Sequence, residues 1–110
     1  MTEKNIIDLA LSFPGTESCS HFDRIGFRVL GKKMFATYLD KNKTVNIFLT
    51  TQEQKVFCEM NVGIYPVPNK WGLKGATTFE LDKVLKEILT EALLSAYNNV
   101  LSKKIKIYEC

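Results

Sequence analysis

The sequence predicts an α+β domain of two layers, in which helices pack on one face of an antiparallel sheet. Three observations predict this class. Apolar residues recur every three to four positions near both ends of the chain, which is the spacing of an amphipathic helix. Between those ends, apolar and polar residues alternate. Short turns separate the alternating runs, as in a meander, and the predicted element order is α-β-β-β-α-β-β-α.

The first predicted helix begins after Thr2, whose side chain can cap it. Its apolar face has the spacing i, i+3, i+4, i+7 and consists of Ile6, Leu9, Ala10 and Phe13. Pro14 and Gly15 end the helix. Residues 16–21 are small and polar, and we interpret them as a loop.

From residue 22 onward the apolar spacing changes to every second residue, which indicates three strands joined by short turns. In the first strand, Arg24 and Arg28 are expected on the face opposite the apolar residues. The second strand is expected to place three residues on one face: Met34, Ala36 and Tyr38. The third strand does the same with Val45, Ile47 and Leu49.

The second half of the chain returns to mixed patterns. Either Thr50 with Glu53 or Thr51 with Gln54 can form a capping box. The short helix that follows is expected to face inward with Val56, Phe57 and Met60. Two prolines place 64–68 at a sheet edge, 69–75 is a glycine-containing loop, and 76–81 is a strand.

The last helix is the clearest element of the sequence and is predicted from about residue 82 to residue 101. Its inward stripe keeps a period of 3.6 residues and comprises Leu85, Ile88, Leu89, Ala92, Leu93, Ala96, Tyr97 and Val100. Residues 105–108 alternate, so they form either a short strand or a frayed end.

Length and composition are those of one ordinary globular domain. The chain has 110 residues, of which 45% are hydrophobic and 25% charged, and we assign 1–110 to a single domain with 102–110 as a candidate flexible tail. Its first residues do not resemble a signal peptide, and its apolar runs are shorter than a membrane span. We therefore expect a cytoplasmic protein with no membrane partner.

The sequence contains no recognisable active site, so we predict that the protein is not an enzyme. Cys19, His21 and Asp23 are too close in sequence to converge on one reacting atom, and we assign His21 a loop role. The three cysteines are widely spaced without a CxxC pair, which predicts reduced thiols, no metal and no cofactor.

Basic side chains are the candidate binding residues. The net charge of +3 permits an anionic partner without requiring one. Lysines occupy both turns of the meander, and two more flank the single tryptophan, whose ring could stack on a base. The alternatives are that the lysines serve solubility and that the tryptophan closes the core. The candidates are Arg24, Arg28, Lys32, Lys33, Lys41, Lys43, Lys70, Trp71 and Lys74.

Several short motifs occur in an order and spacing that resemble the MmcQ/YjbR family. They are Leu11-Ser12-Phe13-Pro14-Gly15-Thr16-Glu17, Phe27-Arg28-Val29, Gly31-Lys32-Lys33-Met34-Phe35-Ala36, Asn69-Lys70-Trp71-Gly72 and Thr77-Thr78. The resemblance covers residues 5–101. It implies a fold like that of type III secretion chaperones and a DNA-binding role through two hairpin wings. Many members have His-Trp where this chain has Lys70-Trp71, so a role for that histidine does not carry over.

We therefore predict a small non-enzymatic binding domain. DNA is the first candidate partner, held by the basic hairpin turns through its phosphates. The alternative is a protein–protein interaction adaptor that uses the sheet face, as the chaperone-like fold suggests.

Overall fold

One antiparallel sheet of six strands forms a layer of the computed structural model, which describes residues 2–102. The strands lie side by side in the order β1-β2-β3-β4-β6-β5, and every neighbouring pair is antiparallel. Their bounds are β1 (Thr16–His21), β2 (Arg24–Val29), β3 (Met34–Leu39), β4 (Thr44–Phe48), β5 (Ile64–Pro66) and β6 (Ala76–Glu80).

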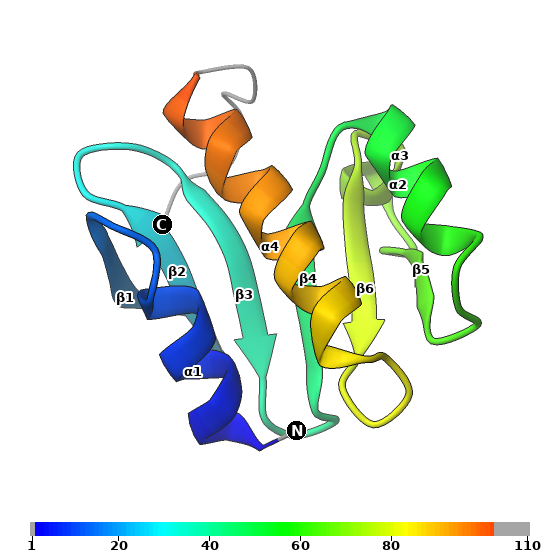
Figure 1. Ribbon diagram of the computed structural model, residues 1–110, viewed down its shortest axis with the longest axis horizontal. Coiled ribbons are helices and arrows are strands. Elements are labelled where there is room, and N and C mark those ends of the chain that lie inside the picture. Colours follow the sequence, from blue (N-terminus) through cyan, green and yellow to red (C-terminus); the bar gives the residue numbers. More distant parts are fainter. Residues whose placement is uncertain (1, 103–110) are drawn as a thin grey trace.

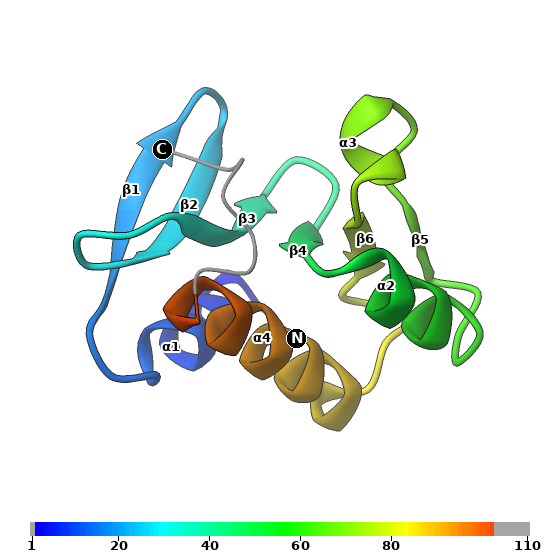
Figure 2. The same ribbon diagram turned by 90° about the horizontal axis from the view of Figure 1, so that it is seen from above.

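Helices pack against this sheet, most of them on one face. They are α1 (Glu3–Leu11), α2 (Thr51–Cys58), α3 (Lys70–Leu73) and α4 (Lys86–Leu101). Helices α1 and α4 lie on the same side of the sheet, with α4 running across its middle (Figure 1). The predicted α+β class, with an antiparallel sheet and helices packed against it, is therefore confirmed. The short α3 lies on the other side of the sheet and was predicted as loop (Figure 2).

The main core lies between the sheet and the two long helices. Alternate residues of the strands face it, including Phe27, Ile47 and Phe79, each fully buried. An aromatic group closes one end, because Phe13 stacks on Tyr97 at 5.1 Å and meets Phe35 edge-on at 6.3 Å. The Tyr97 hydroxyl donates a hydrogen bond to the Pro14 carbonyl, which joins α4 to the chain just after α1.

Segment 16–21 is a strand rather than the predicted loop. It pairs with β2 along its whole length, from Thr16 opposite Val29 to His21 opposite Arg24. Its sequence lacks apolar alternation because β1 lies at the edge of the sheet and no residue of it is buried.

A β-bulge changes the predicted face of one residue in β3. The pairing register shifts so that Phe27 lies opposite Ala36, whereas Arg28 lies opposite Met34. The extra residue turns Met34 away from the main core, which contains Ala36 and Tyr38. Met34 instead packs in a small cluster on the other face of the sheet. The prediction that Met34, Ala36 and Tyr38 share a face was therefore wrong for Met34.

Two helix predictions also need correction. In α2 only Phe57 is buried, whereas Val56 is 53% and Met60 47% exposed. Helix α4 begins at Lys86, so Leu85 is its N-cap residue and is 65% exposed rather than inward.

The predicted alternation at 105–108 lies outside the described residues. In the described part of the chain, no helix has the length and apolar character needed to cross a bilayer.

Candidate binding cleft on the open face of the sheet

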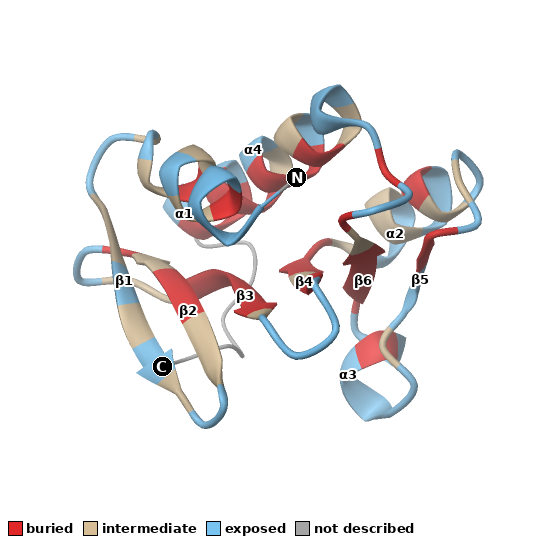
Figure 3. Cartoon of the chain, turned by 90° about the horizontal axis from the view of Figure 1, so that it is seen from below, coloured by how far each residue is buried: buried red, intermediate tan, exposed pale blue. Residues whose placement is uncertain are grey.

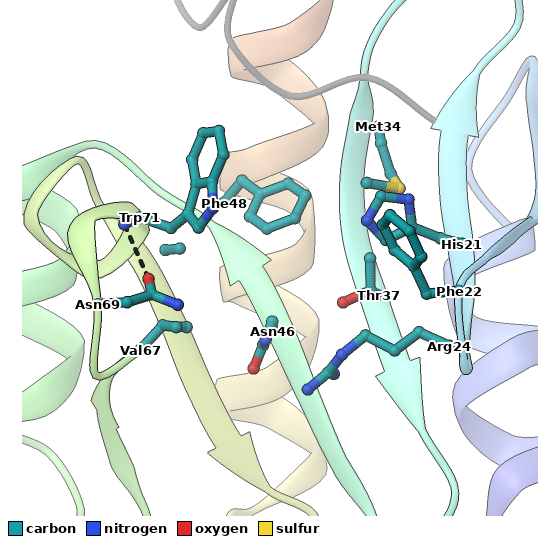
Figure 4. Close-up of a pocket in the computed structure, with 11 residues that line it drawn as sticks. His21, Phe22, Arg24, Met34, Thr37, Asn46, Phe48, Val67, Asn69 and Trp71 are labelled. Carbon is teal, nitrogen blue, oxygen red and sulfur yellow. Dashed lines mark hydrogen bonds between the residues drawn. The ribbon is translucent and has the colours of Figure 1, made fainter.

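The face of the sheet opposite α1 and α4, called here the open face, contains a cleft of about 370 Å³. That volume lies within the range of small-molecule sites in proteins. Figure 2 shows the β1–β2 hairpin rising on one side of the open face and α3 on the other. Strands β3 and β4 form the floor, and the side chains that line the cleft come from six elements and their loops (Figure 4).

The β1–β2 hairpin forms one wall of the cleft. His21 and Arg24 are paired across its end, and the two residues between them make the turn. Phe22 occupies this turn with a left-handed backbone, at φ 59°, and its side chain is 93% exposed. The ring of His21 meets the ring of Phe22 edge-on at 4.9 Å. The turn therefore presents an aromatic side chain to solvent at the rim, where it gains nothing from core packing. Figure 3 shows the end of the β1–β2 hairpin in the colour of exposed residues.

Helix α3 forms the opposite wall. The Asn69 side chain caps it by accepting a hydrogen bond from the Trp71 backbone N–H at 2.8 Å. The backbone at Gly72 packs so closely on the residue after β5 that an added Cβ would lie 1.8 Å from the Val67 carbonyl oxygen. Gln54 of α2 donates to the carbonyls of Gly72 and Ala76, which ties this wall to the sheet.

Two lysines next to Trp71 place positive charge on the α3 wall. The Lys70 ammonium lies 5.8 Å and the Lys74 ammonium 5.4 Å from the centroid of its ring. Both distances are within the reach of a cation–π interaction. The indole is 37% exposed, so it is neither a buried core lid nor a fully solvated side chain.

A row of polar residues crosses the floor. Thr37 of β3 lies opposite Asn46 of β4, and Asn46 lies opposite Thr78 of β6. The Asn46 side-chain oxygen accepts a hydrogen bond from the Thr78 hydroxyl at 2.8 Å. Since these positions alternate with core residues along each strand, the row faces the cleft.

Arg24 is the most unusual residue of the cleft. Figure 4 shows its side chain extending from β2 across the floor toward Asn46. Its Nη1 nitrogen is buried and makes no hydrogen bond to any residue between 2 and 102. Burial lowers the pKa of the guanidinium, while Asp23 acts in the opposite direction. A buried donor without a partner is costly, so this group is better satisfied with an acceptor in the cleft.

The structure brings together four of the nine predicted binding residues. Arg24 and Trp71 line the cleft, and Lys70 and Lys74 flank Trp71. Arg28 is instead ion-paired to Glu17, with its Nε 2.6 Å from the carboxylate.

The four turn lysines do not form one patch. Lys32 and Lys33 precede β3, whereas Lys41 and Lys43 follow it. A six-residue strand separates the two turns by roughly 20 Å. Figure 2 shows the β2–β3 turn pointing away from the space between the β1–β2 hairpin and α3.

Several lining residues were not predicted from the sequence. His21 was assigned to a loop, but it ends β1 and lines the cleft. Phe22, Thr37, Asn46 and Asn69 were not singled out. The available signal was a polar residue at the centre of a strand that is otherwise apolar, as at Thr37 and Asn46.

The cysteines and acidic residues do not form a metal site among residues 2–102, where no group of three potential ligands occurs. Cys58 is a free thiol, as predicted. Cys19 is disulfide-bonded, so the prediction of three reduced cysteines was wrong there. Cys110 lies outside the described residues.

The fold is shared with a solved structure. The chain is similar to a protein from Pseudomonas syringae whose crystal structure came from a structural genomics consortium, with a TM-score of 0.73 and 16% sequence identity. The similarity covers 91% of this chain and 99% of that one. At this identity the likeness shows the fold alone. No family model and no curated protein matches the chain, so the MmcQ/YjbR resemblance stays a prediction.

Proposed function

We propose that the protein is a non-enzymatic domain that binds single-stranded nucleic acid in the cleft of the open face. The observation that carries this proposal is the Nη1 of Arg24, which is buried on the cleft floor without a hydrogen-bond partner among residues 2–102. An arginine whose donor is buried without a protein partner fits an anionic or acceptor-rich ligand. Phe22 and Trp71 add aromatic rings on the two walls, which suit stacking on bases.

A single strand suits this cleft better than a duplex. In a duplex the bases are stacked inside the helix, and their flat faces are not accessible to aromatic side chains. The cleft has walls on two sides, so an unstacked base can enter it while the phosphates stay at the rim. Lys70 and Lys74 lie on the α3 wall, where they can neutralise those phosphates.

The MmcQ/YjbR resemblance supports a DNA-binding role, but the residues best placed to bind differ from those predicted from the sequence. Among the basic residues predicted to bind, Arg28 is neutralised by Glu17, and the turn lysines lie at opposite ends of β3. We therefore assign binding to the cleft rather than to the lysine turns.

Fluorescence anisotropy with a labelled oligonucleotide of about 12 bases, within the usual ~4–16 nucleotide site size, tests the proposal. The two lysines on the α3 wall predict a log–log salt slope of about −1.4, since each phosphate contact to a single strand contributes roughly −0.7. Replacing Lys70 and Lys74 together by Gln should bring the slope close to zero, because it removes both phosphate contacts.

The matched control replaces Lys32 and Lys33 by Gln, which removes the same charge away from the cleft. This variant should keep the parent slope. If it flattened the slope while the Lys70/Lys74 variant did not, binding would belong to the turns. If no oligonucleotide bound at about 0.1 mM protein in low salt, the nucleic-acid function would be refuted.

A protein-interaction adaptor is the second candidate function. The observation that favours it is the outer side of α2 and the loop after it, where Val56, Met60 and Val62 are 53%, 47% and 89% exposed. Such a surface would bind a partner with little salt dependence. Replacing Val56 and Met60 by Lys should leave oligonucleotide binding unchanged but abolish partner binding if the adaptor function holds.

A further inference from the structure

Three side chains of the cleft can offer hydrogen-bond donors to a ligand. Arg24 has five N–H donors and no acceptor, and its Nη1 has no hydrogen-bond partner in the part of the chain that the structure describes. The side-chain oxygen of Asn69 accepts from the Trp71 backbone, and its NH₂ group is not used in that contact. Asn46 uses its oxygen in the same way with the Thr78 hydroxyl. Three side chains from three different parts of the chain therefore offer donors to one space.

A ligand that fits these groups presents acceptors to them. Burying a second donor against Arg24 would leave both unsatisfied, which costs about 1–3 kcal/mol per group. The two aromatic walls add a preference for a flat ligand. The ligand edge that faces the floor is thus flat and rich in acceptors.

We propose that the cleft selects guanine over adenine within the single strand, with Arg24 reading the guanine O6 and N7. This inference rests on the proposed function and names the base that the site prefers. Guanine O6 and N7 are two adjacent acceptors, and a planar guanidinium can donate to both at once. Adenine replaces O6 by an NH₂ donor, which would oppose the Arg24 donors. Cytosine presents an NH₂ group at the corresponding position and is disfavoured for the same reason.

Base analogues in one oligonucleotide frame test this selection. The frame is an adenine 12-mer, within the site size of a single domain, with one central guanine, hypoxanthine, 7-deazaguanine or adenine. Guanine and hypoxanthine both keep O6 and N7, so both should bind about tenfold more tightly than adenine. The 7-deazaguanine oligonucleotide lacks only N7 and should lose most of that advantage. Equal affinity for the guanine and adenine oligonucleotides would overturn the inference while leaving the proposed function intact.

Arg24→Lys separates base reading from simple charge attraction. Lysine keeps the positive charge but cannot donate to two acceptors in a planar geometry. The variant should therefore bind the adenine oligonucleotide as the parent does and show about onefold discrimination between guanine and adenine. A variant that kept the tenfold preference would refute the role of Arg24. Circular dichroism and a urea titration establish that the variant is folded.

Competition with free nucleotides tests whether the cleft binds guanine within a strand or as a mononucleotide. Competition with 5′-GMP and 5′-AMP measures whether the cleft recognises the mononucleotide without a strand. Displacement by 5′-GMP only at concentrations well above the oligonucleotide affinity is expected, because the strand adds phosphate contacts at Lys70 and Lys74. If 5′-GMP bound as tightly as the strand and 5′-AMP did not, guanine selection would stand and the nucleic-acid function would fail. If no nucleotide and no oligonucleotide bound, both would fail.

Discussion

Replacing Arg24 by Met should stabilise the protein while weakening its binding to guanine-containing strands. Methionine retains much of the stem of arginine and can fill the same space between β2 and the cleft floor. The change removes a buried Nη1 donor that has no partner in the described chain. Such a group costs about 1–3 kcal/mol, and because Arg24 as a whole is only partly buried we expect the lower end, about 1 kcal/mol.

Urea denaturation followed by circular dichroism measures this effect. With a slope of about 2 kcal/mol per molar urea, a gain of 1 kcal/mol moves the midpoint up by about 0.5 M. Arg28→Met is the matched control, because it removes the same side chain from the same strand. Its ion pair with Glu17 involves side chains that are 37% and 35% exposed, so its loss should cost only about 0–1 kcal/mol.

The opposite result would refute the reasoning. If Arg24→Met lowered the free energy of unfolding by 1 kcal/mol or more, Arg24 would contribute to the fold. It would then not be a group held unsatisfied for a ligand. A stabilised variant that still bound oligonucleotides with the parent affinity would equally contradict the proposed role.

Three further predictions concern the fold, each measured by urea or pH titration. Gly75→Ala should destabilise the protein by at least about 2 kcal/mol, because Gly75 has φ 118° and an added Cβ would lie 1.9 Å from the Leu49 carbonyl oxygen; a loss under 1 kcal/mol would contradict this. Tyr97→Phe should cost about 1 kcal/mol by removing the hydrogen bond to Pro14, and an unchanged urea midpoint would show that this bond adds nothing. Burial, and then the hydrogen bond to Asp40, raises the pKa of Tyr38 to about 12. Because the unfolded tyrosine titrates near 10, stability should fall as pH rises from about 10 to 12, and Tyr38→Phe should reduce that fall.

The layers of the fold could be predicted from the sequence because they depend on local periodicity. The apolar stripe of α4 and the alternation in β2 and β4 are strong signals, and apart from Leu85 the residues predicted to face inward belong to the core or pack against it. The exceptions have identifiable causes. Strand β1 is polar because it lies at an edge of the sheet. Met34 changes face because of a β-bulge, which no single residue type in the sequence predicts.

The cleft could be predicted only in part, because it is assembled from distant segments. Arg24 and Trp71 were found as a basic residue on a strand and an aromatic residue in a loop. That they line one cleft depends on the curl of the β1–β2 hairpin and on the position of α3. The pairing of Thr37 with Asn46 likewise depends on strand register, which alternation does not specify. The turn lysines gave the stronger charge signal, yet the strand between them keeps them apart.

Chemical-shift mapping tests the central claim most directly. A two-dimensional ¹H–¹⁵N spectrum of the labelled protein would be recorded while a guanine-containing single strand is added. We expect the largest changes at the backbone amides of Arg24, Thr37 and Asn46 and at the indole N–H of Trp71. The amides of 31–33, 40–43 and α2 should change little. Shifts confined to the lysine turns or to α2, with the cleft unaffected, would contradict the assignment of binding to the open face.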